Sequence, residues 1–286
     1  MPLSIADERV IGSKPLSKPV MPPRKKNPGK KKTVKVRLFK LTFDLLLCFI
    51  ALTFIPVLTY RVIDPPTTPL MWIRWAEGGY DKSFPRTIKQ WRTLEEISPE
   101  FLKAVIASED QKFFNHKGFD WQAVKHAFIN NMESKRKTGA STITMQTARN
   151  VFLWQDRNWL RKGLEVYFTF LIEIFWTKER ILEVYFNLIE WGDGIFGCEA
   201  ASLKYFKKSA LLASPVESAW LAAILPNPRV WPKKKYRKLV KRKQARILNQ
   251  MNHIRLPDFT FDYAQAPADQ NSPGPFSSRP GQGRTS

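Results

Sequence analysis

The sequence has 286 residues, of which 47 are Lys or Arg and 25 are Asp or Glu, so its formal net charge is +22. This length suits one large domain with attached segments, and the charge favours an anionic partner such as a phospholipid headgroup, a pyrophosphate or a nucleic acid. The two cysteines, Cys48 and Cys198, and the three histidines have no metal-binding spacing, which argues against a disulfide scaffold and a histidine-rich metal site.

The N-terminal part of the chain contains two regions of opposite composition. Residues 1–40 are rich in Pro and Lys and are predicted to be a disordered basic segment. Residues 41–60, LTFDLLLCFIALTFIPVLTY, are apolar and long enough, at about 20 residues, to cross a bilayer as a helix. The alternatives are a cleaved signal peptide, against which the long basic lead argues, and a buried soluble helix. Basic residues cluster only before the run, so the positive-inside rule predicts a cytoplasmic N-terminus and an external remainder.

The rest of the chain is predicted to consist of a connector, one helical domain and a tail. Residues 61–97 contain several Pro and Trp and are interpreted as a connector, in which a small hairpin is also conceivable. Residues 98–256 are almost wholly helical in pattern. Residues 257–286 are rich in Pro, Gly, Ser and Gln and are predicted to be a disordered tail.

The most informative stretch is Ser98–Asp120, SPEFLKAVIASEDQKFFNHKGFD. Ser98 and Pro99 are typical of a helix start, and apolar residues then recur at three- and four-residue steps. Glu109 falls on the same face as Val105 and Ile106. It is therefore either a buried carboxylate paired with a cation or a catalytic carboxylate whose basicity is set by its surroundings.

Two later stretches carry further candidate groups. Gly139–Gln146, GASTITMQ, is a glycine- and hydroxyl-rich helix entry that either holds an anion or is an ordinary Ser/Thr cap. Leu160–Trp176 is predicted to be a core or membrane-grazing helix, in which Arg161 and Glu165 are four residues apart and share a face. This spacing is typical of a surface ion pair, although the apolar surroundings of Glu165 argue against exposure.

The remaining helical signals complete the domain. Lys178–Glu190 is amphipathic, Gly192, Gly194 and Gly197 predict a loop, and Ser214 to Glu217 is a capping box that opens a helix. Residues 233–246 form a strongly basic helix. We find no internal repeat.

These residues, taken in order, closely resemble the monofunctional biosynthetic peptidoglycan glycosyltransferases, a family shared with the N-terminal domains of class A penicillin-binding proteins. The matching positions are Glu109, Asp110, Phe113, His116, Gly118 and Asp120; Gly139, Ser141–Thr144, Gln146 and Asn150; Arg161, Lys162 and Glu165; and Lys178, Ile181, Leu182, Tyr185 and Asn187. The sequence departs from the family pattern at Met145, Arg149 and Lys243. Arg149 keeps the positive charge of the usual Lys, so we expect activity to survive.

The resemblance implies a mainly α, lysozyme-like glycosyltransferase domain that polymerises lipid II into β-1,4-linked glycan with inversion and release of undecaprenyl pyrophosphate. Glu109 is expected to be the general base and Glu165 a second catalytic carboxylate. The expected substrate-binding residues are Asp110, Phe113, His116, Thr142, Gln146, Arg149, Asn150, Arg161 and Lys162. No cofactor is expected to be obligatory, with assistance by Mg²⁺ or Mn²⁺ left open.

The expected partners are lipid II, the growing lipid-linked glycan and membrane lipid, with division or elongation proteins as further candidates and no nucleic acid. The expected location is the inner membrane, with the catalytic domain in the periplasm. Two other classes of function compete with this interpretation. One is a lytic or lysozyme-type peptidoglycan hydrolase, and the other is a non-enzymatic basic tether for membrane lipid or nucleic acid, which leaves Glu109 and Glu165 unexplained. No transpeptidase domain is expected, because the chain is too short for a second domain. Two motifs typical of transpeptidases do occur, at Ser134–Lys137 and Lys137–Gly139, but they overlap and so cannot form one site.

Overall fold

A computed structural model of the chain describes residues 29–78, 90–134, 139–156 and 158–257. Within these residues the protein is mainly helical, which confirms the predicted fold class. The residues outside the described part are 1–28, 79–89, 135–138, 157 and 258–286. They include part of the predicted connector, most of the predicted basic loop at 134–137 and nearly all of the predicted tail. The chain divides into two compact units, residues 1–50 and 51–286.

The α-helices are α1 (Gly29–Tyr60), α2 (Pro69–Ala76), α3 (Pro99–Glu109), α4 (Trp121–Glu133), α5 (Ile143–Phe152), α6 (Trp159–Phe175), α7 (Lys178–Leu188), α8 (Cys198–Phe206), α9 (Pro215–Ile224) and α10 (Arg237–Met251). Four 3₁₀ turns are η1 (Leu94–Glu96), η2 (Phe113–Asn115), η3 (Ala210–Leu212) and η4 (Lys234–Tyr236). A two-stranded hairpin pairs β1 (Glu190–Gly192) with β2 (Ile195–Phe196).

The first helix is longer than the apolar run that predicted it. It begins at Gly29, so residues 29–40, which were predicted to be disordered, are helical. Lys, Arg and Leu have good helix propensity, and an adjoining apolar helix removes the cost of nucleation. Among the described residues, the stretch Lys35–Tyr60 is long and apolar enough to cross a membrane, consistent with membrane anchoring.

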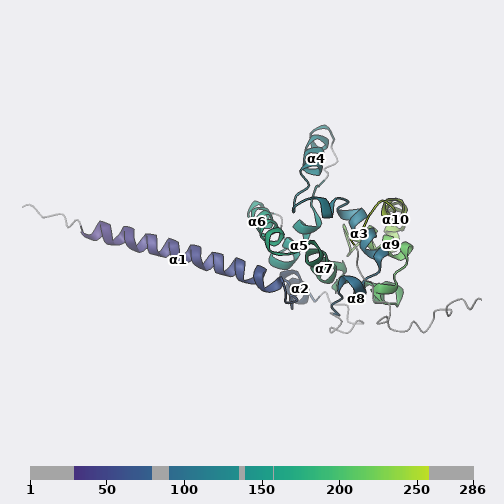
Figure 1. The fold of residues 1–286 in the computed structure, drawn as a ribbon, viewed down its shortest axis with the longest axis horizontal. Helices are drawn as coiled ribbons and strands as arrows, with labels where there is room; N and C mark the ends of the chain where they lie inside the picture. Colours follow the sequence, from purple (N-terminus) through teal and green to yellow (C-terminus); the bar gives the residue numbers. More distant parts are fainter. Residues whose placement is uncertain (1–28, 79–89, 135–138, 157, 258–286) are drawn as a thin grey trace, which may run out of the picture. The chain divides into compact units, whose positions relative to one another are not determined.

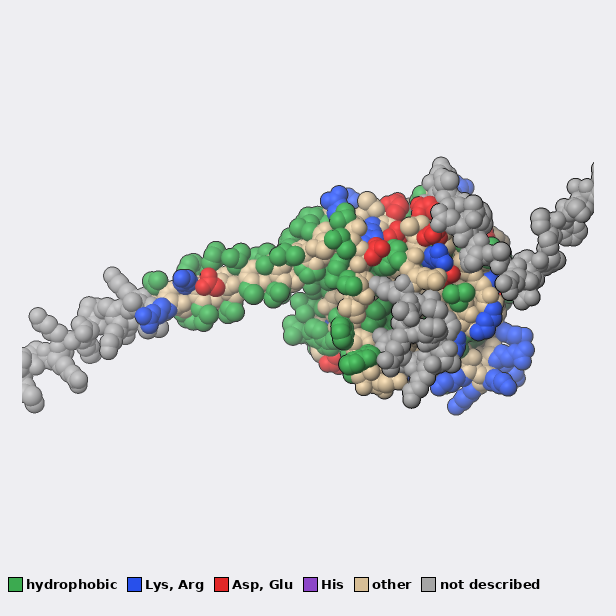
Figure 2. All heavy atoms as spheres, turned by 90° about the horizontal axis from the view of Figure 1, so that it is seen from below, with side chains coloured by type: hydrophobic (Ala, Val, Ile, Leu, Met, Phe, Trp, Pro, Cys, Tyr) green, Lys and Arg blue, Asp and Glu red, His purple; other side chains and the backbone are tan. Residues whose placement is uncertain are grey.

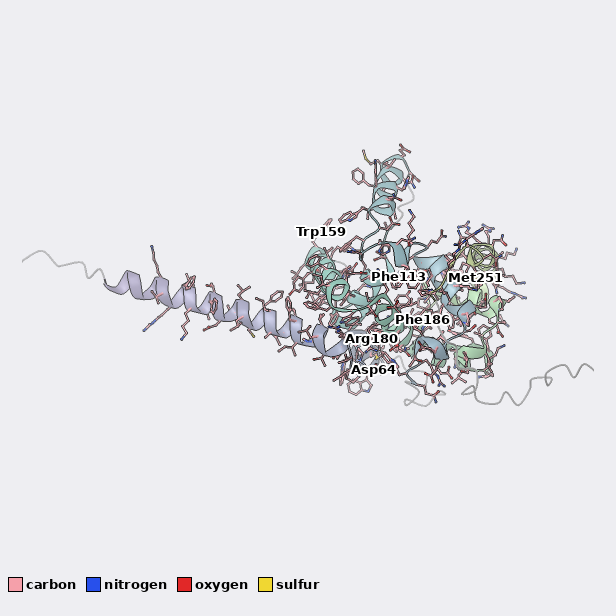
Figure 3. All side chains as sticks on the ribbon, in the orientation of Figure 1. Asp64, Phe113, Trp159, Arg180, Phe186 and Met251 are labelled. Atoms are coloured by element: carbon pink, nitrogen blue, oxygen red, sulfur yellow. The ribbon has the colours of Figure 1, made fainter. Side chains whose placement is uncertain are left out.

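In the larger unit, the last turns of α1 are tied to α6 and α7. The Trp176 indole donates to the Val57 carbonyl oxygen at 2.7 Å, and the rings of Phe54 and Phe175 meet edge to face. Arg180 donates to the carbonyl oxygens of Tyr60 and Ile63 and forms an ion pair with Asp64 at 2.9 Å (Figure 3). These contacts make the end of the helix part of the folded unit.

The core of the larger unit contains two packed groups of helices. Helix α5 packs against α6 and α7, whereas α3, α9 and α10 pack against one another (Figure 1). Phe101 of α3 lies between the two groups, with its ring 5.2 Å from that of Phe186 on α7 and 5.0 Å from that of Trp191. All three side chains are buried. The aromatic contacts therefore join the helix that ends at Glu109 to α7 and the hairpin.

Helix α3 confirms the predicted helix but ends earlier than the apolar pattern suggests. Leu102, Val105 and Ile106 are buried as expected, yet the helix ends at Glu109, and Phe113 belongs to the 3₁₀ turn η2. Ser98 occupies the N-cap position without capping, because its hydroxyl donates to the Ala213 carbonyl oxygen at 2.8 Å. Glu109 therefore stands at a helix end.

The hairpin corrects the prediction for residues 190–196. A loop was expected at Gly192, Gly194 and Gly197. A hairpin was considered only within residues 61–97, where the described residues contain α2 and η1. The two strands are joined by Asp193 and Gly194, and Gly194 has a φ of +69°. An Asp-Gly pair between short apolar stretches is a hairpin signal, and it was overlooked because each strand is only two or three residues long.

Two helices of the larger unit expose apolar stripes to solvent. On α4 the stripe comprises Trp121, Val124, Phe128 and Met132, and on α6 it comprises Trp159, Leu160, Val166, Phe170 and Ile174. Trp159 is 91% exposed and points outward at the edge of α6 (Figure 3). The opposite face of α6 is buried, so the helix is both a core helix and one with an apolar outer face. Figure 2 shows apolar side chains gathered at the end of the unit where Figure 1 labels α6, and Lys and Arg at the end where it labels α10.

A partly buried polar network connects α5, α6 and α7. The Glu173 carboxylate accepts from the Thr144 hydroxyl and forms an ion pair with Lys178 at 2.7 Å. The Lys178 ammonium lies 4.5 Å from the centre of the Phe113 ring. Gly118 approaches this network closely, because a Cβ built there would lie 2.8 Å from Glu173 Cγ.

Substituting Gly118 by Ala is expected to lower the free energy of unfolding by about 2–4 kcal/mol, from left-handed backbone strain and the clash with Glu173. Gly118 has a φ of +80°, and Glu173 is held in place by its two partners. Gly163→Ala on α6 is the matched control: nothing lies within 4 Å of its Cβ position, and we expect stabilisation of about 0.5–1 kcal/mol. Chemical denaturation of both variants measures the difference, and equal stabilities would contradict the close approach.

Candidate active site

Glu109 is a half-buried carboxylate held by two hydrogen-bond donors. Gln146 Nε2 of α5 donates to Glu109 Oε2 at 2.9 Å, and Ser108 Oγ donates to Glu109 Oε1 at 3.2 Å. Both donors are neutral, so they orient the carboxylate without neutralising it. Glu109 also lines a cavity of about 240 Å³ with Asp120 and the Gly139–Thr142 segment. No cation of the described residues forms an ion pair with Glu109, and its role as a catalytic carboxylate stays a prediction.

Asp110 is a buried carboxylate that binds the start of α5. Its carboxylate accepts from His116 Nε2 at 2.9 Å and from the Ile143 backbone N–H at 3.0 Å. A buried carboxylate that accepts a backbone N–H at a helix N-terminus is stabilised by a charge-assisted hydrogen bond and by the helix dipole. Asp110, next to Glu109 in the sequence, thus joins His116 to the first residue of α5. The Phe113 side chain is fully buried.

The first turn of α5 is capped by the protein itself. Thr142 is the N-cap, and its hydroxyl oxygen accepts from the Met145 N–H while donating to the Gly118 carbonyl oxygen at 2.6 Å. The Thr144 hydroxyl is bound to Glu173 and the Ile143 N–H to Asp110. Of the two alternatives for Gly139–Gln146, the described contacts therefore show the ordinary helix cap. Of the three hydroxyl residues in this segment, only Ser141 is exposed.

Gln146 links Glu109 to α7 through Tyr185. The Tyr185 hydroxyl donates to Gln146 Oε1 at 3.2 Å, while the amide nitrogen of Gln146 donates to Glu109. Burial and the nearby Glu109 charge raise the pKa of Tyr185 well above its usual range, so the phenol stays protonated and remains a donor. The chain Tyr185–Gln146–Glu109 therefore fixes the orientation of the amide and, through it, of the carboxylate.

A larger cavity of about 400 Å³ is lined in part by Gln146 and Tyr185. Arg149 and Asn150 line it, together with Arg74 of α2 and Arg229 from the segment after α9, and we call it the arginine cavity. The guanidinium group of Arg149 forms no hydrogen bond or ion pair with any described residue, and its Nε is buried. An unpaired guanidinium in a cavity wall is available for an anionic ligand.

Glu165 is the buried centre of a three-residue cluster on α6, in which the Lys162 side chain is 39% exposed. It is 1% exposed, and its two carboxylate oxygens lie 2.5 Å from Arg161 Nη1 and from Lys162 Nζ. The predicted Arg161–Glu165 pair is present but is not a surface ion pair, because Arg161 is also largely buried. Asn158 caps this helix by accepting from the Arg161 N–H at 2.7 Å.

The structure brings the predicted site residues together in two connected sets and one separate cluster. Hydrogen bonds join Glu109, Asp110, His116 and Gln146 to the start of α5, and Gln146 is shared with the arginine cavity that Arg149 and Asn150 line. No hydrogen bond or ion pair joins Glu109 to the Glu165 cluster among the described residues. The two are related by the packing of α5 against α6.

The predicted site list omitted Lys243 of α10. Its ammonium lies 4.9 Å from the centre of the Trp231 ring. Burial lowers the pKa of Lys243, and the charge of Glu109 opposes this shift, so the two side chains interact electrostatically. The available signal was its position in the basic helix, at the place where the family has an Arg. Among the described residues, no group of His, Cys, Asp and Glu has the arrangement of a metal site.

Comparison with known proteins defines the class to which this fold and site belong. The transglycosylase family model matches residues 81–252. A biosynthetic peptidoglycan transglycosylase of Bdellovibrio bacteriovorus is 52% identical over 195 residues, covering 68% of this chain and 78% of that protein. A protein of the same name from Caulobacter vibrioides is 46% identical over 215 residues, covering 75% and 91%. The chain belongs to the transglycosylase family.

Proposed function

We propose that this protein is a membrane-anchored peptidoglycan glycosyltransferase that polymerises lipid II, with Glu109 as its general base. The observation that carries this proposal is the Glu109 carboxylate, which is held by Gln146 and Ser108 and lines a cavity in a chain of the transglycosylase family. The proposed catalytic domain corresponds to residues 98–256.

In the proposed reaction, Glu109 takes the proton of the 4-hydroxyl group of the acceptor, lipid II. The oxygen then attacks the anomeric carbon of the lipid-linked donor strand from the face opposite the lipid. The β-1,4 bond forms with inversion, and undecaprenyl pyrophosphate leaves with the bonding electrons. A positioned base of this kind contributes about 10²- to 10⁴-fold to a rate.

The departing pyrophosphate requires cations on the donor side. Arg161 and Lys162 are oriented by the buried Glu165, and Arg149 is unpaired among the described residues. We assign to these cations the stabilisation of negative charge that develops as the anomeric bond breaks. Glu165 acts in this proposal as the second carboxylate, which keeps the two cations in place.

The substrates are lipid-linked, and the protein has apolar surfaces suited to a membrane. The stretch Lys35–Tyr60 has the length and composition of a membrane span, and the apolar stripes of α4 and α6 are exposed. Apolar helix faces bearing Trp and Phe bind at the boundary between headgroups and acyl chains. We propose a single-pass inner-membrane protein with a cytoplasmic N-terminus and a periplasmic catalytic domain.

The test is polymerisation of purified lipid II by the full chain in detergent. We expect glycan strands that a muramidase digests, together with one undecaprenyl pyrophosphate for each bond formed. The competing hydrolase function predicts instead the release of fragments from finished peptidoglycan without any lipid-linked substrate. Fragment release without polymerisation would overturn the proposal.

A further inference from the structure

The arginine cavity has a rim of alternating charges that the reaction described above does not use. Asp193 pairs with Arg229 at 2.7 Å, and Arg229 lies 3.8 Å from Glu77. Glu77 in turn pairs with Arg74 at 2.7 Å, and Arg74 donates to both carboxylate oxygens of Glu190. This series of ion pairs, which we call the rim ladder, connects α2, the hairpin and the segment after α9.

The two ends of the rim ladder differ in burial and therefore in strength. The side chains of Arg74 and Glu190 are 13% and 8% exposed, and their bidentate pairing makes this end rigid. At the other end the side chains of Arg229 and Asp193 are 40% and 57% exposed, and such pairs contribute little because water screens them. Arg229 can therefore exchange Asp193 for another anion at low cost, whereas Arg74 cannot readily release Glu190.

The wall of the arginine cavity has the chemistry of a site for an acidic peptide. The lining residues include three arginines, Arg74, Arg149 and Arg229, and one acidic residue, Glu190. Glu77 and Asp193, which pair with Arg74 and Arg229, are not lining residues. The amide side chains among the lining residues are Gln146, Asn150, Gln155 and Asn227. Amides both donate and accept hydrogen bonds, which matches the N–H and C=O groups of a peptide, and guanidinium groups match the planar geometry of carboxylates.

The position of the arginine cavity indicates which substrate would occupy it. Gln146 separates it from Glu109, and Arg149, which we assign to the donor, forms part of its wall. Of the three cations that we assign to the pyrophosphate, Arg149 lines the cavity, whereas Arg161 and Lys162 do not. Because Arg149 forms part of its wall, we place the cavity on the donor side.

We propose that the arginine cavity binds a carboxylate of the peptide carried by the donor strand, and that Arg229 forms the ion pair with this carboxylate. This inference rests on the proposed function and deepens it by naming a feature of the donor that the site selects. Asp193 holds Arg229 in the absence of the peptide, and the peptide carboxylate takes its place on binding.

The test compares two donors that differ only in charge. Each is a short lipid-linked glycan whose terminal 4-hydroxyl is blocked, so that it serves only as donor. One carries free peptide carboxylates and the other carries the corresponding carboxamides, and both react with the same acceptor. We expect the wild type to use the acidic donor with about tenfold higher kcat/KM, the effect of one charge-assisted pair. In Arg229→Gln this preference should fall to about twofold or less.

Arg255→Gln is the matched control, since Arg255 is exposed and is not a lining residue of the cavity. It should keep the wild-type preference, and thermal unfolding should show that both variants are folded. The inference is overturned if the wild type uses the two donors equally, or if Arg229→Gln slows both alike. Failure of the proposed function would appear differently, as no glycan formed from either donor or from lipid II.

Discussion

Glu109→Gln is expected to lower the turnover of lipid II by about a thousandfold, because the amide cannot accept the proton of the attacking hydroxyl. The substitution keeps the size of the side chain. The neighbouring donors, Gln146 and Ser108, then face a group that still presents one oxygen. Binding of lipid II should change little. Release of undecaprenyl pyrophosphate, followed over time at saturating lipid II, measures the effect.

Glu100→Gln is the control for this substitution. Glu100 lies on the same helix and pairs with Lys103 at 3.0 Å, with about a third of its side chain exposed. Loss of such a pair costs less than about 1 kcal/mol, so turnover should stay within twofold of the wild type. If Glu109→Gln retained a tenth or more of wild-type turnover, another group would have to be the base.

Glu165→Gln is expected to lower kcat by about a hundredfold, the typical effect of removing one electrostatic contribution from a transition state. The buried carboxylate holds Arg161 and Lys162 at 2.5 Å through its two oxygens, and the amide keeps only one of these oxygens and has no negative charge. The cations then lose the orientation that we assign to pyrophosphate departure. Stability should fall as well, by about 3 kcal/mol, because breaking a buried ion pair leaves charges uncompensated.

Glu173→Gln separates the catalytic effect from the structural one. Glu173 is on the same helix, is largely buried and also pairs with a lysine, Lys178. It should lose a similar amount of stability, while kcat of the folded protein falls less than tenfold. Calorimetry and single-turnover kinetics of the two variants give the comparison. Equal losses of kcat would mean that Glu165 is only a structural residue.

Membrane anchoring and the helical class could be predicted from local pattern alone. An apolar run of about 20 residues behind a basic segment needs no tertiary information, because its length and composition match a bilayer. The capping box at Ser214 was also predicted and is confirmed, since its hydrogen bonds are formed within four residues of sequence. The hairpin was overlooked because its strands are too short to show an alternating pattern.

The contacts that define the site could not be predicted in the same way. Gln146 follows Glu109 by 37 residues, and only the packing of the helices brings the amide to the carboxylate. The Thr142 hydroxyl, besides capping its own helix, donates to the Gly118 carbonyl oxygen at 2.6 Å, a contact across 24 residues of sequence. Lys243 approaches Glu109 because α10 packs on α3, which no local pattern indicates.

The sequence by itself determined the class of protein and the apolar anchoring segment and predicted the candidate catalytic groups, because these follow from residue type and short-range spacing. The tertiary structure alone decided which contacts those groups make. It gave Glu109 neutral partners, buried Glu165 between two cations, and left Arg149 unpaired among the described residues at the wall of the arginine cavity. The physical reason is that charge environment and burial depend on residues far apart in sequence, which only packing brings within a few ångströms.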